Sequence, residues 1–361
     1  MKIGLLTFHE TTNFGSYLQT YGLYNAICML GYDCEVIDYK CESIIKRELP
    51  KSKPKSFFPR DWAKYLLIER KKKKKYFAFQ KQVSNTIKLS RPYDNFNIMT
   101  ANKMYDAFIV GSDILWNLEI TGGDQTFFLN FVENNQKKYA YSTSIGNPWE
   151  EEERSIILPL LKNFRKISLR EKTSAIWLSN FLKKKVEAVC DPTMLMDRSV
   201  WDKIQENRIN KWGDYVLTYF NTKQMLDDAR FFAKKYGYQI ISINYGLPIK
   251  GVKNVSPYEV AEFLTLIKYA KTVFTASYHG MLFAIYYEIP FYCYMRSNGN
   301  NIRFQDVLER LKLKECNRDD QGTLLNLDID YQSVTTEVKK WRDESLKVLK
   351  NLLGDINYVC L

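Results

Sequence analysis

Residues 272–290 read TVFTASYHGMLFAIYYEIP, and this stretch indicates the fold class of the chain. Residues 272–276 are β-branched, aromatic or small, which is typical of a strand covered on both faces of a sheet. Residues 281–287 are apolar or aromatic on all sides, as in a helix buried against a sheet. The pattern predicts a strand, a polar turn and a helix, with functional residues at the turn.

The turn contains Ser277, Tyr278, His279 and Gly280. Ser277 is a candidate N-cap, so the amides of the first helical turn and the positive end of the helix dipole would face a ligand at the strand's carboxyl end. This arrangement predicts an anion-binding site formed by Ser277 and Gly280, with His279 as the candidate for catalysis. The alternative for His279 is a structural imidazole in a capped turn.

A strand predicted at residues 2–8 is followed by a helix that ends near Gly31 and by a strand at 34–39, which together form a β-α-β unit. The loop after the first strand would lie at the carboxyl edge of the sheet. Glycine lets the backbone approach a ligand there, and polar side chains can bind it. The binding candidates in this loop are Asn13, Gly15, Ser16 and Gln19. Helix capping is the alternative for this loop.

The same pattern of an apolar strand and a polar turn recurs after the strands predicted at 105–110 and 166–169. Because the carboxyl ends of parallel strands meet at one edge of the sheet, we expect these turns to lie near the first loop. The candidates here are Gly111, Ser112, Asp113, Asn117 and Arg170. For Arg170 the alternative is a surface salt bridge to Glu171 or another neighbour.

The second half also alternates strands and helices, with strands predicted at 215–220, 239–243 and 290–294. Pro192 imposes an extended or turning conformation on the residue before it, so we place a domain boundary there. The prediction is an α/β protein with two Rossmann-like domains, 1–192 and 193–361, and a GT-B-like cleft between them. The helix 331–353 is a candidate for packing back on the N-terminal domain. Two more binding candidates, Asn301 and Arg303, follow the last strand.

The formal net charge is +12, and much of the excess lies in a basic helical insertion of the first domain, near residues 46–91. The insertion also carries many aromatic and aliphatic residues. One interpretation is a solvated, lysine-rich helix face, and the other is contact of segment 62–82 with an anionic membrane surface. We expect no nucleic-acid partner, because no nucleic-acid-binding motif accompanies the charge.

The location and the cofactors follow from what the sequence lacks. No run of eighteen apolar residues could span a bilayer, and the N-terminus does not resemble a signal peptide. These features predict a cytoplasmic protein, at most peripheral at the inner face of the membrane. The seven cysteines form no C-x-x-C pair and the chain has two histidines, so we expect reduced thiols, no metal and no cofactor.

Six motifs, taken in chain order, resemble those of the polysaccharide pyruvyl transferase family. They are NFGSYLQTY at 13–21, GSDILWN at 111–117, SLRE at 168–171, DPTML at 191–195, TASYHGMLFAI at 275–285 and NIRF at 301–304. The resemblance implies a GT-B-like fold, phosphoenolpyruvate as donor substrate, and a lipid-linked oligosaccharide or a surface polysaccharide as acceptor. The product would be a pyruvate ketal on a capsule or exopolysaccharide sugar.

The resemblance also implies roles for single residues. His279 would supply or relay a proton, and Arg170 would pair with a carboxylate or phosphate. Members of the family often carry an arginine two residues before the histidine, where this chain has Ser277. Arg296, Arg303 or a lysine would then supply the second cation, or the donor or acceptor differs. Two other functions stay open: a GT-B glycosyltransferase that uses a nucleotide-sugar, and a non-catalytic subunit of polysaccharide assembly.

Overall fold

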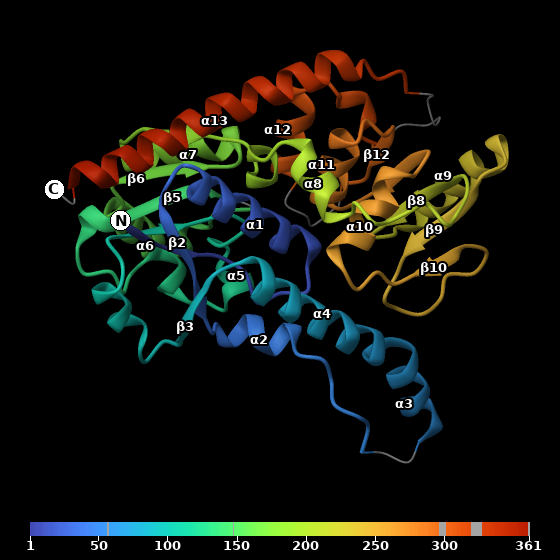
Figure 1. Cartoon of the computed structure of the whole chain (residues 1–361), viewed down its shortest axis with the longest axis horizontal. Coiled ribbons are helices and arrows are strands. Elements are labelled where there is room, and N and C mark those ends of the chain that lie inside the picture. The colour runs from blue at the N-terminus through green and yellow to red at the C-terminus, as the bar shows by residue number, and fades with distance from the viewer. Residues whose placement is uncertain (56–57, 147, 296–300, 319–326, 360–361) are drawn as a thin grey trace. The chain divides into compact units, whose positions relative to one another are not determined.

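The computed structural model describes residues 1–55, 58–146, 148–295, 301–318 and 327–359. The chain divides into two compact units, each a parallel sheet flanked by helices (Figure 1). Unit 1 contains Met1–Glu48, Gln82–Met196 and Val338–Leu361, and unit 2 contains Leu49–Lys81 and Asp197–Glu337. The expected α/β class with two Rossmann-like units is confirmed.

The sheet of unit 1 has seven parallel strands in the order β3-β2-β1-β4-β5-β6-β7. They are β1 Lys2–Leu6, β2 Asp33–Tyr39, β3 Leu89–Tyr93, β4 Ala107–Val110, β5 Lys138–Thr143, β6 Lys166–Leu169 and β7 Val186–Ala188. The order of the strands reverses between β1 and β4. Ligands of open parallel sheets bind outside the carboxyl ends of the strands at such a switch point, so the loops after β1 and β4 are placed for binding.

The helices of unit 1 cover strands that are apolar enough to be buried on both faces. Every residue of β4 and β5 is buried, as parallel strands between two helical layers require. The helices are α1 Phe14–Met29, α2 Glu42–Glu48, α5 Leu118–Thr121, α6 Glu151–Lys162 and α7 Lys172–Leu182, with short 3-10 turns η2 Ile98–Lys103, η3 Gln125–Phe128, η4 Asn135–Lys137 and η5 Pro192–Leu195.

Unit 2 repeats this arrangement with five parallel strands in the order β10-β9-β8-β11-β12. The strands are β8 Tyr215–Tyr219, β9 Gln239–Ile243, β10 Lys253–Val255, β11 Thr272–Thr275 and β12 Phe291–Cys293. The helical segments are α3 Pro59–Lys64, the π-helical turn η1 Tyr65–Glu69, α8 Arg198–Ile204, α9 Lys223–Tyr236, α10 Val260–Lys268, α11 Tyr278–Tyr286, α12 Ile302–Arg310 and the 3-10 turn η6 Lys314–Cys316. Its switch point lies between β8 and β11.

The basic segment is grouped differently in the structure than the sequence suggests. Residues 46–91 were placed in the first domain, whereas Leu49–Lys81 belong to unit 2. Lys75 contributes to this grouping with unit 2, because its ammonium lies 4.2 Å from the ring centre of Tyr245, a residue of that unit. The neighbouring Lys74 lies 5.7 Å from the ring centre of Tyr258. Helix α4, Arg70–Thr86, therefore begins in unit 2 and ends in unit 1.

The last helix, α13 Tyr331–Val359, also has residues in both units. In unit 1 its Ser345 carbonyl accepts a hydrogen bond of 2.8 Å from the hydroxyl of Tyr141 on β5, and its Ser345 hydroxyl accepts one of 2.9 Å from the backbone of Cys190. These bonds attach the middle of α13 to β5 and to the segment after β7 in unit 1. Within the described chain, no helix is both long enough and apolar enough to cross a bilayer.

Two strands, β3 and β10, were not expected from the sequence. Both lie at an edge of their sheet, where pairing on one side is enough. Strand β3 contains Pro92, which an edge strand tolerates because it need not donate a second ladder hydrogen bond. Strand β10 has three residues, which is too short for an alternating pattern to be recognised. The six described cysteines are free thiols, as expected.

Gly22 tests the packing of α1 against η5. A Cβ atom placed on Gly22 would lie 2.4 Å from the carbonyl oxygen of Pro192, so the helix can approach only without a side chain. We expect Gly22→Ala to lower the free energy of unfolding by about 1–3 kcal/mol in urea titrations, despite the higher helix propensity of alanine.

The matched control is Gly354→Ala on α13, where a Cβ meets nothing within 4 Å. Helix propensity alone should then act and stabilise the protein by up to about 1 kcal/mol. Equal stabilisation by both substitutions would contradict the tight contact at Gly22.

Candidate functional site

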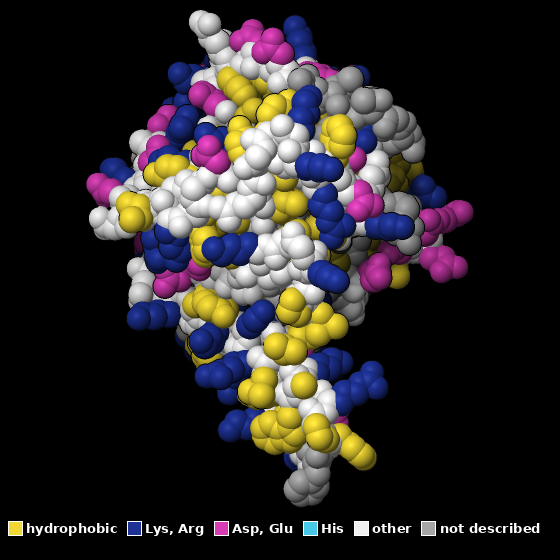
Figure 2. Space-filling view, turned by 90° about the vertical axis from the view of Figure 1, so that its right-hand side faces the viewer, with side chains coloured by type: hydrophobic (Ala, Val, Ile, Leu, Met, Phe, Trp, Pro, Cys, Tyr) yellow, Lys and Arg dark blue, Asp and Glu magenta, His cyan; other side chains and the backbone are white. Residues whose placement is uncertain are grey.

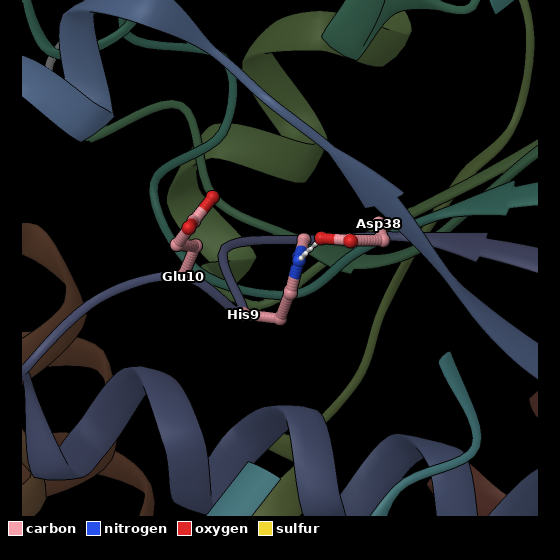
Figure 3. Close-up of side chains that lie close together, drawn as sticks. All are labelled: His9, Glu10 and Asp38. Atoms are coloured by element: carbon pink, nitrogen blue, oxygen red, sulfur yellow. Dashed lines mark hydrogen bonds and ion pairs between the residues drawn. The ribbon is translucent and has the colours of Figure 1, made fainter. Parts of the chain in front are cut away.

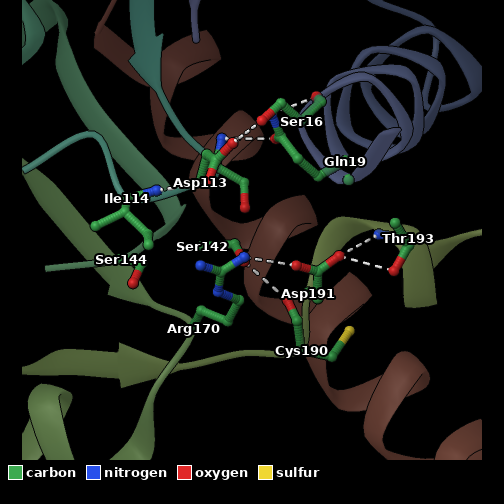
Figure 4. A network of polar contacts seen from close by, with 12 residues as sticks. Ser16, Gln19, Asp113, Ile114, Ser142, Ser144, Arg170, Cys190, Asp191 and Thr193 are labelled. Atoms are coloured by element: carbon green, nitrogen blue, oxygen red, sulfur yellow. Dashed lines mark hydrogen bonds and ion pairs between the residues drawn. The ribbon is translucent and has the colours of Figure 1, made fainter. Parts of the chain in front are cut away.

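The loops after β1 and β4 meet at the switch point of unit 1 (Figure 4). Ser16, in the first turn of α1, donates its hydroxyl to Oδ2 of Asp113. The Oε1 atom of Gln19 accepts a hydrogen bond of 3.2 Å from the backbone of Ser112, and its Nε2 atom donates one of 3.1 Å to the hydroxyl of Thr7. All these side chains are buried. The structure thus brings together two loops that the sequence analysis placed at one edge.

Two of the predicted binding residues are helix caps. The side-chain oxygen of Asn13 accepts a hydrogen bond of 2.8 Å from the backbone of Gly15 and begins α1. Asn117 begins α5 in the same way, through a bond of 3.0 Å from the backbone of Ile120. Both amide oxygens therefore act as helix caps, which was the alternative for the loop that contains Asn13.

Gly111 and Ser112 differ in what they offer to a ligand. Gly111 has a φ of 154°, and a Cβ there would lie 1.9 Å from the carbonyl oxygen of Tyr141, so glycine is needed for packing against β5. The Oγ atom of Ser112 is buried and has no hydrogen-bond partner among the described residues. Buried hydroxyls are nearly always bonded, so Ser112 is a candidate for binding a polar group of a substrate.

Arg170 is buried, and its guanidinium points toward the carboxylate of Asp191 (Figure 4). Its Nη1 atom lies 2.8 Å from Oδ2 of Asp191, and its Nε atom lies 3.5 Å from Oε1 of Glu171. Oε1 of Glu171 also accepts a hydrogen bond of 2.5 Å from the hydroxyl of Ser144. The other carboxylate oxygen of Asp191 accepts bonds of 2.9 and 2.7 Å from the backbone and hydroxyl of Thr193. The cluster contains one cation and two anions.

Arg170 forms the ion pairs that were the alternative to ligand binding, but these pairs are buried and do not lie at the surface. A substrate carboxylate would have to compete with Asp191 and Glu171 for the guanidinium. Because an unpaired buried charge is costly, displacing either carboxylate would be unfavourable. Arg170 therefore holds the two carboxylates in place at the ends of β6 and β7.

In unit 2 the turn predicted after β11 is present. Ser277 is the N-cap of α11, with its hydroxyl accepting a hydrogen bond of 3.2 Å from the backbone of Gly280. Gly280 is required for packing, since a Cβ there would lie 2.7 Å from the hydroxyl of Thr275. His279 lies in the first helical turn and is 7% exposed. The imidazole is thus held at the amino end of a fully buried helix.

Arg303, on α12, brings a cation to this turn. Its guanidinium lies 5.0 Å from the ring centre of Tyr278, and that ring contacts the imidazole of His279 edge-on at 5.3 Å between centres. Asn301 precedes α12, and its backbone carbonyl accepts a hydrogen bond of 2.9 Å from the backbone of Phe304. Arg296 lies outside the described residues. Arg303 is therefore a cation that lies close to α11, the helix that carries His279.

The switch point of unit 2 contains two polar residues that were not among the predicted site residues. Thr218 lies near the end of β8, and Asn221 follows that strand just before α9. The Oγ1 atom of Thr218 and the Oδ1 atom of Asn221 are buried and have no hydrogen-bond partner in the described chain. Polar residues after the strand predicted at 215–220 are the signal that could have identified Asn221.

A second cluster lies beside the first loop of unit 1 (Figure 3). Nε2 of His9 is 2.8 Å from Oδ1 of Asp38, and ligand atoms of His9, Glu10 and Asp38 all lie within 4.8 Å of one another. The ammonium of Lys40 is 2.8 Å from Asp38 and 3.1 Å from Glu10. An adjoining cavity of about 10 Å³ has room for one water. The lysine makes this cluster better suited to anchoring the loop than to binding a metal.

The charge of Asp38 is expected to stabilise the protein. Burial disfavours its ionised form, but hydrogen bonds from His9 and Lys40 outweigh this and lower the pKa of the carboxyl. A carboxyl whose pKa is lowered on folding stabilises the native state above its unfolded pKa of about 4 and loses this contribution as the pH falls through the folded value. Asp38→Asn should lower the free energy of unfolding at pH 7, and the difference should shrink as the pH falls from the unfolded pKa of about 4 through the lowered pKa of the folded carboxyl.

Denaturant titrations across this pH range measure the effect, with Asp343→Asn on α13 as the exposed control. A pH-independent loss at Asp38 would indicate packing rather than charge.

The buried pair at Arg170 leads to a second expectation. Arg170→Ala leaves two buried carboxylates without their cation and should lower the free energy of unfolding by about 3–5 kcal/mol. The control is Arg230→Ala, whose exposed ion pair with Asp227 should contribute less than about 1 kcal/mol. Similar losses for the two variants in urea titrations would contradict the compensating role of Arg170.

Several UDP-GlcNAc 2-epimerases are among the solved structures that are similar to this chain. The enzyme from Neisseria meningitidis, bound to UDP-GlcNAc, has 12% identity over 96% of this chain and 93% of its own, with a TM-score of 0.50. The enzyme from Methanocaldococcus jannaschii has 13% identity over 98% and 99%, with a TM-score of 0.50. A protein from Listeria monocytogenes described as such an epimerase has 11% identity over 96% and 89%, with a TM-score of 0.52. At these identities the likeness shows the fold alone, which is GT-B-like.

Sequence comparison supplies the family. No curated protein matches the chain significantly. The family model for polysaccharide pyruvyl transferase matches residues 13–298, which include helix α1, the loop after β4 and the turn before α11. The chain is therefore a transferase and belongs to the polysaccharide pyruvyl transferase family.

Proposed function

We propose that this protein transfers the pyruvyl group of phosphoenolpyruvate to two hydroxyls of a sugar, as a ketal, on a lipid-linked oligosaccharide or a surface polysaccharide. The observation that supports this most is the position of His279 in the first turn of buried helix α11, with Arg303 beside it. The family match extends across this turn.

Unit 2 suits the donor. Phosphoenolpyruvate carries a phosphate and a carboxylate, and the amino end of a helix favours such groups through its N–H groups and its dipole. The guanidinium of Arg303 can form two parallel hydrogen bonds with either anion. The polar atoms of Thr218 and Asn221, at the same switch point, are available for further bonds.

The chemistry needs an acid beside the donor. His279 would protonate the methylene carbon of phosphoenolpyruvate, directly or through a water, and the second carbon would gain cationic character. One sugar hydroxyl attacks that carbon, phosphate leaves, and a second hydroxyl takes its place. The proton of one sugar hydroxyl returns to His279 and replaces the one given to the methylene carbon, and the proton of the other hydroxyl leaves with the phosphate.

Unit 1 suits the acceptor. The carboxyl edge of its sheet carries hydroxyls and carboxylates, including Ser112, Asp113 and Glu171, while the buried cation Arg170 is bonded to carboxylates. Such groups can hydrogen-bond neutral sugar hydroxyls but repel an anionic donor. The proposed mechanism uses no metal or cofactor. If the acceptor is lipid-linked, the enzyme works in the cytoplasm at the inner face of the membrane.

His279→Gln tests the role of the imidazole. Loss of a general acid should lower the turnover number by about 10²–10⁴-fold, measured as phosphate released from phosphoenolpyruvate with a lipid-linked oligosaccharide extract. Binding of phosphoenolpyruvate, measured by calorimetry, should change much less.

Arg303→Gln tests the cation beside this turn. It should weaken the binding of phosphoenolpyruvate by about 10–100-fold, because a hydrogen bond to a charged group is lost.

Arg310→Gln is the control on the same helix, where the arginine pairs with Glu337 at 3.2 Å. It should leave binding and turnover unchanged. Tight binding of a nucleoside diphosphate without binding of phosphoenolpyruvate would instead indicate a nucleotide-sugar enzyme. A protein that turns over no donor would be a non-catalytic subunit, and either result would contradict the proposal.

A further inference from the structure

The segment Leu49–Lys81 concentrates almost all of the excess charge of the chain. It contains twelve lysines and arginines against two acidic residues, a formal charge of +10 within a total of +12. Of the two acidic residues, Glu69 is buried. The surface of this segment is therefore strongly basic, with exposed lysines both before α3 and along α4.

The same segment exposes large apolar side chains. Trp62 is 39% exposed, Leu66 52% and Leu67 43%, and Phe58 and Phe77 are also exposed. Trp62 and Leu66 are four residues apart and so lie on one side of the helix. Figure 2 shows hydrophobic side chains gathered together with lysine and arginine side chains at the lower end of this face, where Figure 1 places α3.

The opposite side of these helical turns is fixed within unit 2. Tyr65 and Phe79 are buried, and the ammonium of Lys75 lies over the rings of Phe79 and Tyr245, at 5.4 and 4.2 Å. The outer residues are therefore exposed on a segment whose inner side is packed. They form an amphipathic surface whose inner side is anchored and whose outer side is both apolar and basic.

We propose that this surface binds an anionic phospholipid bilayer. Trp62, Leu66 and Leu67 would enter the boundary between headgroups and acyl chains, and the lysines from Lys71 to Lys73 would contact the lipid phosphates. This inference concerns where the enzyme works and does not depend on the chemistry at His279.

The charge and the side-chain types of this surface favour a bilayer over other partners. A second copy of the same surface would bring two segments of +10 together, which repel each other. Nucleic acid would use the positive charge and could stack on the ring of Trp62, but it would leave the exposed Leu66 and Leu67 without an apolar partner. An anionic bilayer accepts both features at once, since it presents phosphates above an apolar layer.

Flotation of the full-length protein with vesicles tests the inference without any substrate. The wild type should float with phosphatidylcholine vesicles that contain phosphatidylglycerol, not with pure phosphatidylcholine, and less at high salt. Replacing Trp62, Leu66 and Leu67 together by alanine should weaken the partition coefficient at least about tenfold. Replacing Lys71 to Lys73 by alanine should do the same, since each lysine near the surface contributes about fivefold.

Two controls match these variants. Phe96, Ile209 and Phe231 are exposed apolar residues elsewhere, and Lys234, Lys235, Lys339 and Lys347 are exposed helical lysines elsewhere. Their replacement by alanine should leave flotation unchanged. The proposal would be overturned if the wild type did not float, or if the control variants lost as much flotation as the test variants. It would also be overturned by a dimer or a nucleic-acid complex that the substitutions of Trp62, Leu66 and Leu67 abolish. Phosphate release measured in detergent reports separately on the transferase activity.

Discussion

The buried ion pair between Arg170 and Asp191 connects the parts of unit 1 on which its switch point depends. Arg170 directly follows β6, and its partner Asp191 caps η5 by accepting two hydrogen bonds from Thr193. The next residue, Pro192, presents its carbonyl oxygen to α1 at a contact that only Gly22 allows. Helix α1 in turn carries Ser16, which bonds to Asp113. One charge therefore helps to place a series of contacts that reaches the loop after β4.

This arrangement explains why the two units differ in the chemistry that they offer. In unit 1 the cation at the carboxyl edge is bonded to carboxylates, and what is left for a ligand is a set of hydroxyls and acidic groups. In unit 2 the turn before α11 combines a helix amino end, an imidazole and a nearby guanidinium. A transfer from an anionic donor to a neutral sugar requires two such different surfaces, which is why the proposed division of the substrates follows the charges.

Much of the fold could be predicted from the sequence, since β1, β4 and β11 are short runs of mostly apolar or β-branched residues that end in polar turns. The order of the strands could not, because periodicity shows which residues are buried but not which strand lies beside which. The partner of Arg170 was missed for the same reason, since Asp191 is reached only through the pairing of β6 with β7. The contact of His9 with Asp38 likewise depends on the neighbouring strands β1 and β2.

Ser277 shows how a local requirement can move a functional group to another element. The hydroxyl at this position caps α11, and its loss would leave the backbone of Gly280 without a partner at a cost of about 1 kcal/mol. An arginine at the same position could supply charge but not this cap, because its side chain has no acceptor. Arg303 on α12 lies against Tyr278, so a cation reaches the same turn from a different helix while the cap is kept. The missing arginine at 277 is therefore compatible with an anion site at α11, provided that α12 holds its place beside that helix.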